Sequence, residues 1–326
     1  MTAKGFYRQL IEDIRVSEDE IKAARRRRDE LRAKLETVIG KRTGGVETFA
    51  SGALAAGLQN RPLNDVDVVA TTPDFLAGWR SDPHQAQRDV RAWLAPTINA
   101  KFEFSTHALK LTYPSEDFTA DVVIGVRQPS GIIIPHCPKG EARLWLPTDP
   151  ARHAKLVRER KLPDRPAIFA QQVRILKALN REWGLRAYDD RKPLASFHLT
   201  ALALAIFRKG VEVSHDEGTP MFLEAAAKLV LAPLPNPAGV GPDLEAHDPE
   251  AASALLAEAG QKTRRALSVS DDEAEELLND VFGDRDQRRA LASGNPVGVA
   301  HGGKFVAAAG AGAAVRLIPP VRSHGE

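Results

Sequence analysis

Three aspartates interrupt two otherwise apolar segments, and they constrain the fold more than any other feature of the sequence. Asp65 and Asp67 alternate with valines in the segment 65–70, and Asp121 is the only charge in the segment 119–126. Alternate residues of a strand share a face, so a strand at 65–70 would aim both carboxylates at one point while its valines pack. An unpaired buried carboxylate is costly, and Asp121 therefore needs compensation.

The spacing of the first two aspartates suits a hard divalent cation. Mg²⁺ takes oxygen ligands, commonly one or two carboxylates plus substrate phosphates, and carboxylates this close repel unless a cation lies between them. If the strand with Asp121 lies beside the strand with Asp65 and Asp67, the three would form a two-metal site for phosphoryl transfer. An Asp-x-Asp pattern alone is expected about once by chance in such a chain. The alternative is a strand-end turn or two exposed aspartates.

Two glycines precede the acidic segment. Gly52 and Gly57 bracket a predicted short loop, whose backbone N–H groups would approach a phosphate closely. Two spaced glycines are a weak signal by themselves, and an ordinary turn is the alternative.

Hydrophobic spacing divides the chain into a mixed first half and a helical second half. Residues 4–39 have helical periodicity, and Ser17 with Glu20 predicts a capping box between two helices or within one bent helix. Strand patterns lie at 66–70, 101–104, 108–113 and 118–126, with one helix predicted between 73 and 96. Helical patterns return at 169–179, 196–207, 249–266 and 271–282. The first half is therefore α+β or α/β in class, and a helical second domain follows.

Composition removes several classes of protein. The 326 residues suffice for about two domains, and the net charge of +2 provides no large field of one sign, which disfavours duplex nucleic acid as a partner. Cys137 is the only cysteine, which excludes a disulfide framework and favours a reducing compartment. Residues 1–15 lack a secretory apolar stretch and no apolar run reaches the ~18 residues of a membrane span, so we expect a cytoplasmic protein without a membrane partner.

These motifs together resemble a known superfamily. The glycine segment, Asp65-x-Asp67 and the later Asp121 look like the DNA polymerase β-like nucleotidyltransferases, whose hallmark is Gly-Ser, then Asp-x-Asp, then a third Asp. More narrowly, three segments resemble the cGAS/DncV-like bacterial nucleotidyltransferases (CD-NTases), and they lie at 145–153, 174–177 and 193–199. The resemblance covers roughly residues 5–290 and follows the order of the family's motifs.

The resemblance implies an α+β, two-lobed enzyme with an N-terminal helical spine, a small catalytic sheet and a helical C-terminal lobe. The active site would lie between the lobes. We expect a catalytic domain with the N-terminal helices at 1–165, the helical lobe at 166–290 and a flexible Gly/Ala-rich tail at 291–326.

The resemblance also implies the roles of individual side chains. Asp65 and Asp67 would hold two Mg²⁺ ions, and Asp121 would hold the ion that activates the attacking ribose hydroxyl. Lys177 and Ser196 would contact the triphosphate, the lysine as a point charge and the serine as a hydrogen-bond donor. The alternatives are a solvated helix lysine and a helix N-cap serine.

One departure from the family pattern lies in the segment that would bind phosphate. Gly52 and Ala53 are its predicted nucleotide-binding residues, but Ala53 stands where the family usually has a serine, and Leu58 where a threonine is common. Ser51 would substitute for the missing hydroxyl if the turn shifts. Otherwise the segment binds phosphate through backbone groups alone.

The function implied by the family is the joining of ribonucleoside triphosphates, ATP and GTP among them, into a cyclic di- or trinucleotide second messenger for antiphage signalling. Two alternatives stay open. An RNA 3′-end nucleotidyltransferase would need a basic RNA-binding surface, which the net charge of +2 does not favour. A non-catalytic nucleotide sensor is favoured by Ala53. Activation stays open between constitutive activity, a regulatory protein partner and a small-molecule ligand.

Overall fold

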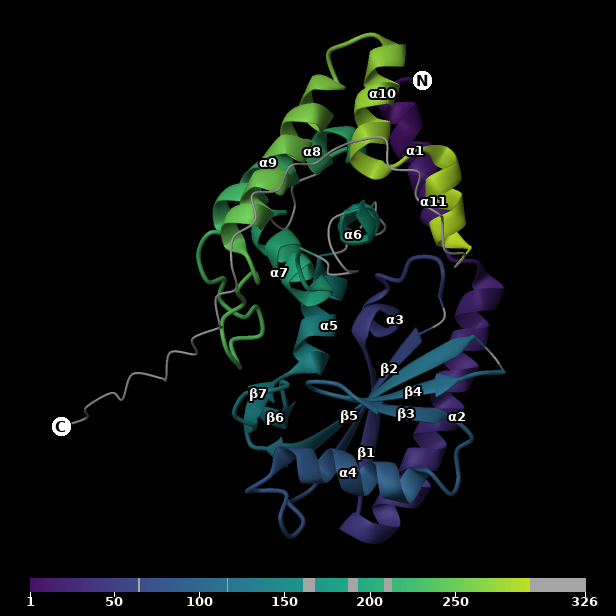
Figure 1. The fold of residues 1–326 in the computed structure, drawn as a ribbon, viewed down its shortest axis with the longest axis vertical. Coiled ribbons are helices and arrows are strands. Elements are labelled where there is room, and N and C mark those ends of the chain that lie inside the picture. The colour runs from purple at the N-terminus through teal and green to yellow at the C-terminus, as the bar shows by residue number, and fades with distance from the viewer. Residues whose placement is uncertain (64, 116, 161–167, 187–192, 208–212, 294–326) are drawn as a thin grey trace, which may run out of the picture.

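The structure is a computed structural model, and it describes residues 1–63, 65–115, 117–160, 168–186, 193–207 and 213–293. One half of the molecule holds a β-sheet with flanking helices, and the other half is a group of helices (Figure 1). Buried hydrophobic side chains form two clusters, one against the sheet and one in the helical half. The predicted α+β fold with two lobes is confirmed.

The chain begins with two helices, α1 (Ala3–Ile14) and α2 (Glu18–Thr43). Ser17 separates them as the N-cap of α2. Its Oγ accepts a hydrogen bond from the Glu20 N–H at 3.2 Å, and its own N–H donates to Glu20 Oε2 at 2.8 Å. The predicted capping box is therefore present, and the helical region is two helices that meet at Ser17.

Within the described residues, seven strands form one mixed sheet. They are β1 (Glu47–Ser51), β2 (Asp65–Thr72), β3 (Lys101–Phe104), β4 (Leu109–Tyr113), β5 (Phe118–Gln128), β6 (Gly131–His136) and β7 (Leu144–Thr148). The order is β1-β2-β5-β4-β3, and β6 pairs with the end of β5 and with β7. Strands β2 and β5 are parallel, whereas the other pairs are antiparallel. The four predicted strands are confirmed as β2 to β5, and β1, β6 and β7 were not predicted.

The two faces of the sheet differ in polarity. On one face, alternate residues of the central strands are buried against α2 and α4 (Pro83–Leu94), and they include Val66, Val68, Val122 and Leu111. The single helix predicted between 73 and 96 is thus α4, and Trp79 stacks on its Trp93 from outside the helix. On the other side, α3 (Gly52–Ala56) and α5 (Pro150–Glu159) lie between the sheet and the helical lobe (Figure 1).

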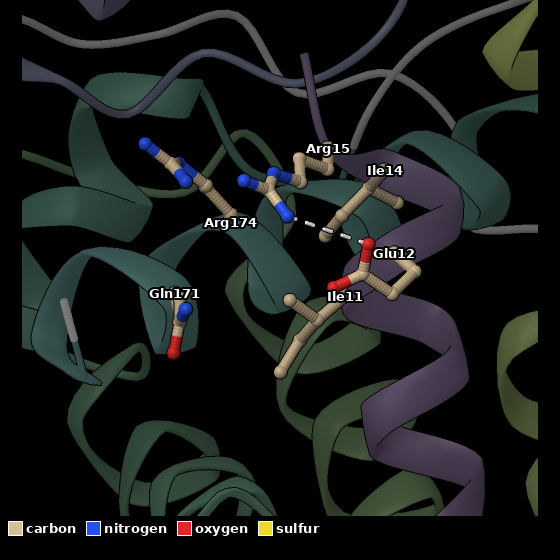
Figure 2. A pocket seen from close by; sticks show the side chains of 6 residues that line it. All are labelled: Ile11, Glu12, Ile14, Arg15, Gln171 and Arg174. Carbon is tan, nitrogen blue, oxygen red and sulfur yellow. Dashed lines mark ion pairs between the residues drawn. The ribbon is translucent and has the colours of Figure 1, made fainter. Parts of the chain in front are cut away.

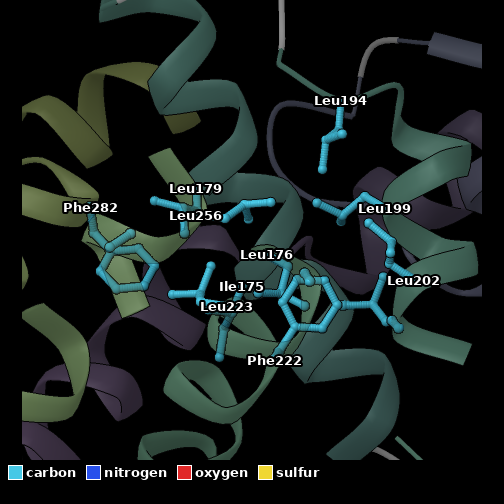
Figure 3. Close-up of a cluster of buried hydrophobic side chains, with 14 of the residues drawn as sticks. Ile175, Leu176, Leu179, Leu194, Leu199, Leu202, Phe222, Leu223, Leu256 and Phe282 are labelled. Carbon is cyan, nitrogen blue, oxygen red and sulfur yellow. The ribbon is translucent and has the colours of Figure 1, made fainter. Parts of the chain in front are cut away.

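The helical lobe consists of α6 (Ile168–Arg186), α7 (Ser196–Ile206), α8 (His215–Leu229), α9 (Pro249–Arg265), α10 (Asp271–Phe282) and α11 (Arg285–Ala292). Figure 3 shows its core, where Ile175, Leu176 and Leu179 of α6 lie among side chains of α8 and α9. Helix α1 packs in this same core, because Phe6 and Tyr7 contact the ring of Phe282. Helix α8 was not predicted, since Gly218 and Pro220 interrupt its periodicity.

Two predictions concern parts of the chain that the structure does not describe. The domain boundary predicted near residue 165 falls within 161–167, outside the described residues, and stays a prediction. Helix α11 ends at Ala292, and the tail predicted for 291–326 otherwise lies outside the described residues. Of the helices in the described ranges, none combines the length and the apolar character needed to cross a membrane.

Candidate active site

The two acidic segments are neighbouring strands, and their aspartates lie on the face of the sheet opposite the α2 and α4 core. Strand β2 pairs with β5 in parallel, and the register places Asp67 directly beside Asp121. Asp65 lies two residues before Asp67, so it shares this face. Asp65 is exposed, whereas Asp67 and Asp121 are half-buried. The condition set for a three-acid site, that these two strands are neighbours, is therefore met.

A row of polar residues crosses the sheet at this level. Ser51 of β1 pairs with Asp67, and Lys110 of β4 pairs with Asp121, so the four side chains share one face. Lys110 was not among the predicted site residues. Its signal was the same as for Asp121, a lone charge between apolar neighbours of a predicted strand.

The acidic residues perturb one another. Burial is the first cause that raises the pKa of Asp67 to about 6, followed by the negative charges of Asp65 and Asp121, while Lys177 lowers it. Burial also raises the pKa of Asp121, although the positive charge of Lys110 opposes that shift. Asp67 and Asp121 both resist ionisation, which indicates a pair of acids that a cation would stabilise.

Gly52 lies directly against Asp67. Its φ of +64° is in the left-handed region, and a Cβ atom at this position would lie 1.7 Å from Oδ2 of Asp67. The close approach and the backbone conformation therefore both require glycine here. Through Gly52, the start of α3 rests on the acidic site.

The segment between the two glycines is helical, so the predicted loop is wrong. Residues 52–56 form α3, and Gly57, at φ +72°, ends it with its N–H donating to the Ala53 carbonyl oxygen. The reason is local, since alanine and leucine have high helix propensity and Gly57 is a good helix C-cap. Ala53 offers no hydroxyl, and Ser51 lies in β1 beside Asp67.

Lys177 enters the site from the helical lobe. It lies on α6, is half-buried, and its Nζ donates to the Leu58 carbonyl oxygen at 3.3 Å. Its charge also acts on Asp67. The alternative of a solvated helix lysine therefore does not describe it.

Ser196 is the first residue of α7. Ala195, not Ser196, is the N-cap residue of that helix. The alternative role of Ser196 as an N-cap is therefore wrong. Its role at a triphosphate stays a prediction.

The carboxylates do not form a closed metal cage within the protein. Across the described ranges, no group of three histidine, cysteine, aspartate or glutamate side chains is arranged to hold a metal ion. Mg²⁺ does not need such a cage, because it commonly takes one or two carboxylates plus waters and substrate phosphates. The donor set of Asp65, Asp67 and Asp121 fits that mode of binding, because burial and the charge of Asp65 raise the pKa of both Asp67 and Asp121.

The structure thus combines a mixed sheet that carries three aspartates with a second, helical lobe. No protein-family model matches the sequence, and no curated protein matches it. Solved structures do show the same fold. Bradyrhizobium diazoefficiens CdnG in complex with GTP is 17% identical with a TM-score of 0.69, over 87% of this chain and 96% of that one.

Two further CD-NTase structures are similar. Escherichia coli CdnC with ATP is 19% identical with a TM-score of 0.67, covering 87% of this chain and 98% of that one. Vibrio cholerae DncV, a cyclic AMP-GMP synthase in complex with a linear intermediate, is 16% identical with a TM-score of 0.58, covering 74% and 70%. The chain therefore has the fold of the CD-NTases, and the resemblance seen in its motifs is confirmed at the level of the fold.

Proposed function

We propose that this protein is a Mg²⁺-dependent nucleotidyltransferase that joins ribonucleoside triphosphates into a cyclic di- or trinucleotide. The observation that carries the proposal is the register of β2 and β5, which sets Asp67 beside Asp121 and on the same face as Asp65. The similar structures support it, because they are complexes with GTP, with ATP and with a linear dinucleotide intermediate.

Asp65, Asp67 and Asp121 would hold the magnesium ions. When bound, Mg²⁺ would supply charge neutralisation at the phosphates and would lower the pKa of a ribose hydroxyl. The half-buried Asp67 and Asp121 would hold the magnesium ions at a defined position, because pairing within the sheet keeps the two strands in register.

The other side chains would bind and orient the nucleotide. Lys177 would act as a point charge at the triphosphate, close to Asp67, whose pKa its charge lowers. In the reaction, the ribose hydroxyl oxygen of one nucleotide bonds to the α-phosphorus of another, the bond to the leaving oxygen breaks, and pyrophosphate departs with release of the hydroxyl proton. A second such step on the linear product closes a ring.

The proposal extends to biological role and compartment. We propose that the product acts in the cytoplasm as a second messenger that activates a downstream effector against phage. The family resemblance alone supports this part.

The test is a product assay. The purified protein is incubated with all four ribonucleoside triphosphates and Mg²⁺, and products are identified by mass spectrometry. We expect a cyclic oligonucleotide and pyrophosphate from the wild type, and neither from the double variant Asp65→Ala, Asp67→Ala. Glu47→Gln, an exposed acid at the start of β1 and four residues before Ser51, is the matched control and is expected to keep full activity.

Each other outcome has a defined meaning. Triphosphate binding without pyrophosphate release would replace the proposal with a nucleotide sensor. Extension of added RNA would replace it with an RNA 3′-end enzyme. An inert wild type that binds no triphosphate, or an active double variant, would refute it.

A further inference from the structure

Helix α6 contacts the chain on both sides of the candidate nucleotide site. Three cationic side chains at helical spacing i, i+3 and i+7 lie along one of its faces, and each donates to a backbone carbonyl oxygen of the segment 57–61, here named the α3–β2 segment. Arg174 Nη2 donates to Gly57 at 2.8 Å, Lys177 Nζ to Leu58 at 3.3 Å and Arg181 Nη1 to Arg61 at 2.7 Å. The α3–β2 segment is therefore held at three points by one helix.

The same segment also bonds back to α6. Asn60 Nδ2 donates to the Arg174 carbonyl oxygen at 2.8 Å. Because this segment joins α3, which rests on Asp67, to β2, which begins at Asp65, its position sets where the acids lie relative to α6.

The arginines are placed there at an energetic cost. Burial lowers the pKa of Arg174, with a further contribution from the charge of Arg15, and burial also lowers the pKa of Arg181. Their acceptors in the α3–β2 segment are carbonyl oxygens, which do not neutralise a guanidinium. Figure 2 shows Arg174 and Gln171 of α6 across a cavity of about 270 Å³ from the last turn of α1, so the region around Arg174 is not tightly filled.

On its other side, α6 holds the start of α7. Asn180 is 1% exposed. Its Nδ2 donates to the Leu194 carbonyl oxygen at 2.8 Å, and its Oδ1 accepts from the Leu194 N–H at 3.2 Å. Leu194 lies two residues before Ser196. A single side-chain amide therefore satisfies both backbone groups of a residue next to a predicted triphosphate contact.

We propose that α6 sets the geometry of the nucleotide site, with Asn180 and Arg181 as positioning residues. Arg181 fixes the α3–β2 segment, and Asn180 fixes the backbone that presents Ser196. Asn180 and Arg181 are adjacent on one helix. The distance between the α3–β2 segment and the start of α7 therefore follows from the rigid geometry of α6. This inference rests on the proposed function, because its effect on turnover is expressed through nucleotide binding.

The first test compares Asn180→Ala with Gln172→Ala. Gln172 is the matched control, because it is also a buried amide of α6, 3% exposed, and its Nε2 donates to Thr219 Oγ1 within the helical lobe. Both variants lose a buried hydrogen bond, so both are expected to lower the melting temperature. Only Asn180→Ala is expected to raise the KM for triphosphates, by roughly tenfold or more, since small displacements of positioning groups have effects of this size.

The second test concerns Arg181. Arg181→Met is expected to raise the KM for triphosphates. Arg181→Lys is expected to raise it less, because lysine keeps a charged hydrogen-bond donor. This pair keeps the proposal falsifiable if Asn180→Ala does not fold.

Hydrogen exchange separates failure of this inference from failure of the proposed function, because it needs no activity. Amides of 194–199 are expected to lose protection in Asn180→Ala, and amides of 57–61 in Arg181→Met, relative to Gln172→Ala. Unchanged protection in these segments would overturn the inference, as would equal changes in KM for Asn180→Ala and Gln172→Ala. A wild type that binds no triphosphate would refute the proposed function, while the exchange result would still decide the positioning role.

Discussion

The contact between Gly52 and Asp67 yields a sharp prediction for Gly52→Ala. The new Cβ would lie 1.7 Å from Oδ2 and 2.4 Å from Cγ of Asp67, whereas ordinary contact begins near 3.4 Å. The carboxylate therefore has to move by about 1.7 Å, or β1 and α3 have to separate from β2. A displacement of about 1 Å at a reacting centre can cost roughly 100-fold in rate. We expect kcat/KM for triphosphates to fall by at least about 100-fold.

Backbone strain contributes separately, and a second glycine isolates it. An L-residue in the left-handed region costs about 1–2 kcal/mol, and Gly57 has φ +72° with nothing within 4 Å of its would-be Cβ. Gly57→Ala therefore carries the same strain without the contact with Asp67. Both variants are expected to melt a few degrees below the wild type, but only Gly52→Ala is expected to lose pyrophosphate release. Equal losses of activity in the two variants would refute the reasoning.

Three further predictions follow from the same structure. The pKa of Asp67 is raised from 3.8 to about 6, so the folded state binds this proton more tightly than the unfolded state. The metal-free protein is therefore expected to lose at most about 3 kcal/mol of stability as the pH rises from about 4 to about 6. Asp67→Asn should abolish this loss in thermal melts with EDTA, and Mg²⁺ should raise the melting temperature of the wild type but not of the variant; a pH-independent wild type would contradict this. Ala53→Ser restores a hydroxyl at the second residue of α3 and is expected to lower the KM for triphosphates a few-fold in steady-state assays, so an unchanged or higher KM would show that backbone groups suffice. Ser17→Ala removes the capping box of α2 and is expected to cost about 1 kcal/mol in denaturant unfolding with KM unchanged, whereas a changed KM would place the α1–α2 junction in the nucleotide site.

The sequence sufficed for elements whose pattern is local. The lone Asp121 in an apolar segment predicted a strand whose carboxylate needs compensation. The family resemblance implied that this carboxylate lies with Asp65 and Asp67, and the register of β2 and β5 places it there. Ser17 and Glu20 predicted the break between α1 and α2 from the chemistry of a capping box. The helix at 271–282 was predicted with its observed ends, since its apolar spacing is regular.

The remainder depends on contacts that no local pattern encodes. Strands β1, β6 and β7 are short and depend on pairing with a neighbour: β1 with β2, β6 with β5, and β7 with β6. The helix at 52–56 was predictable from the sequence, because the residues from Ala53 to Ala56 favour a helix. It was instead interpreted as a phosphate-binding loop. The packing of α1 in the helical lobe joins residues that lie far apart in the sequence.

The role of net charge changes once the positions of the charges are known. A value of +2 averages over the whole chain, whereas interactions between exposed charges decay over about 8 Å at physiological ionic strength. Within the site, Lys110 lies beside Asp121, and α6 directs Lys177 with two half-buried arginines toward the chain around Asp67. On α2, by contrast, Arg26 and Arg28 are paired with Glu30 and Asp29. Lys177 and Lys110 act on Asp67 and Asp121 themselves. Two cations at one acidic site, rather than many spread along a surface, favour a compact polyphosphate over a long nucleic acid as the ligand.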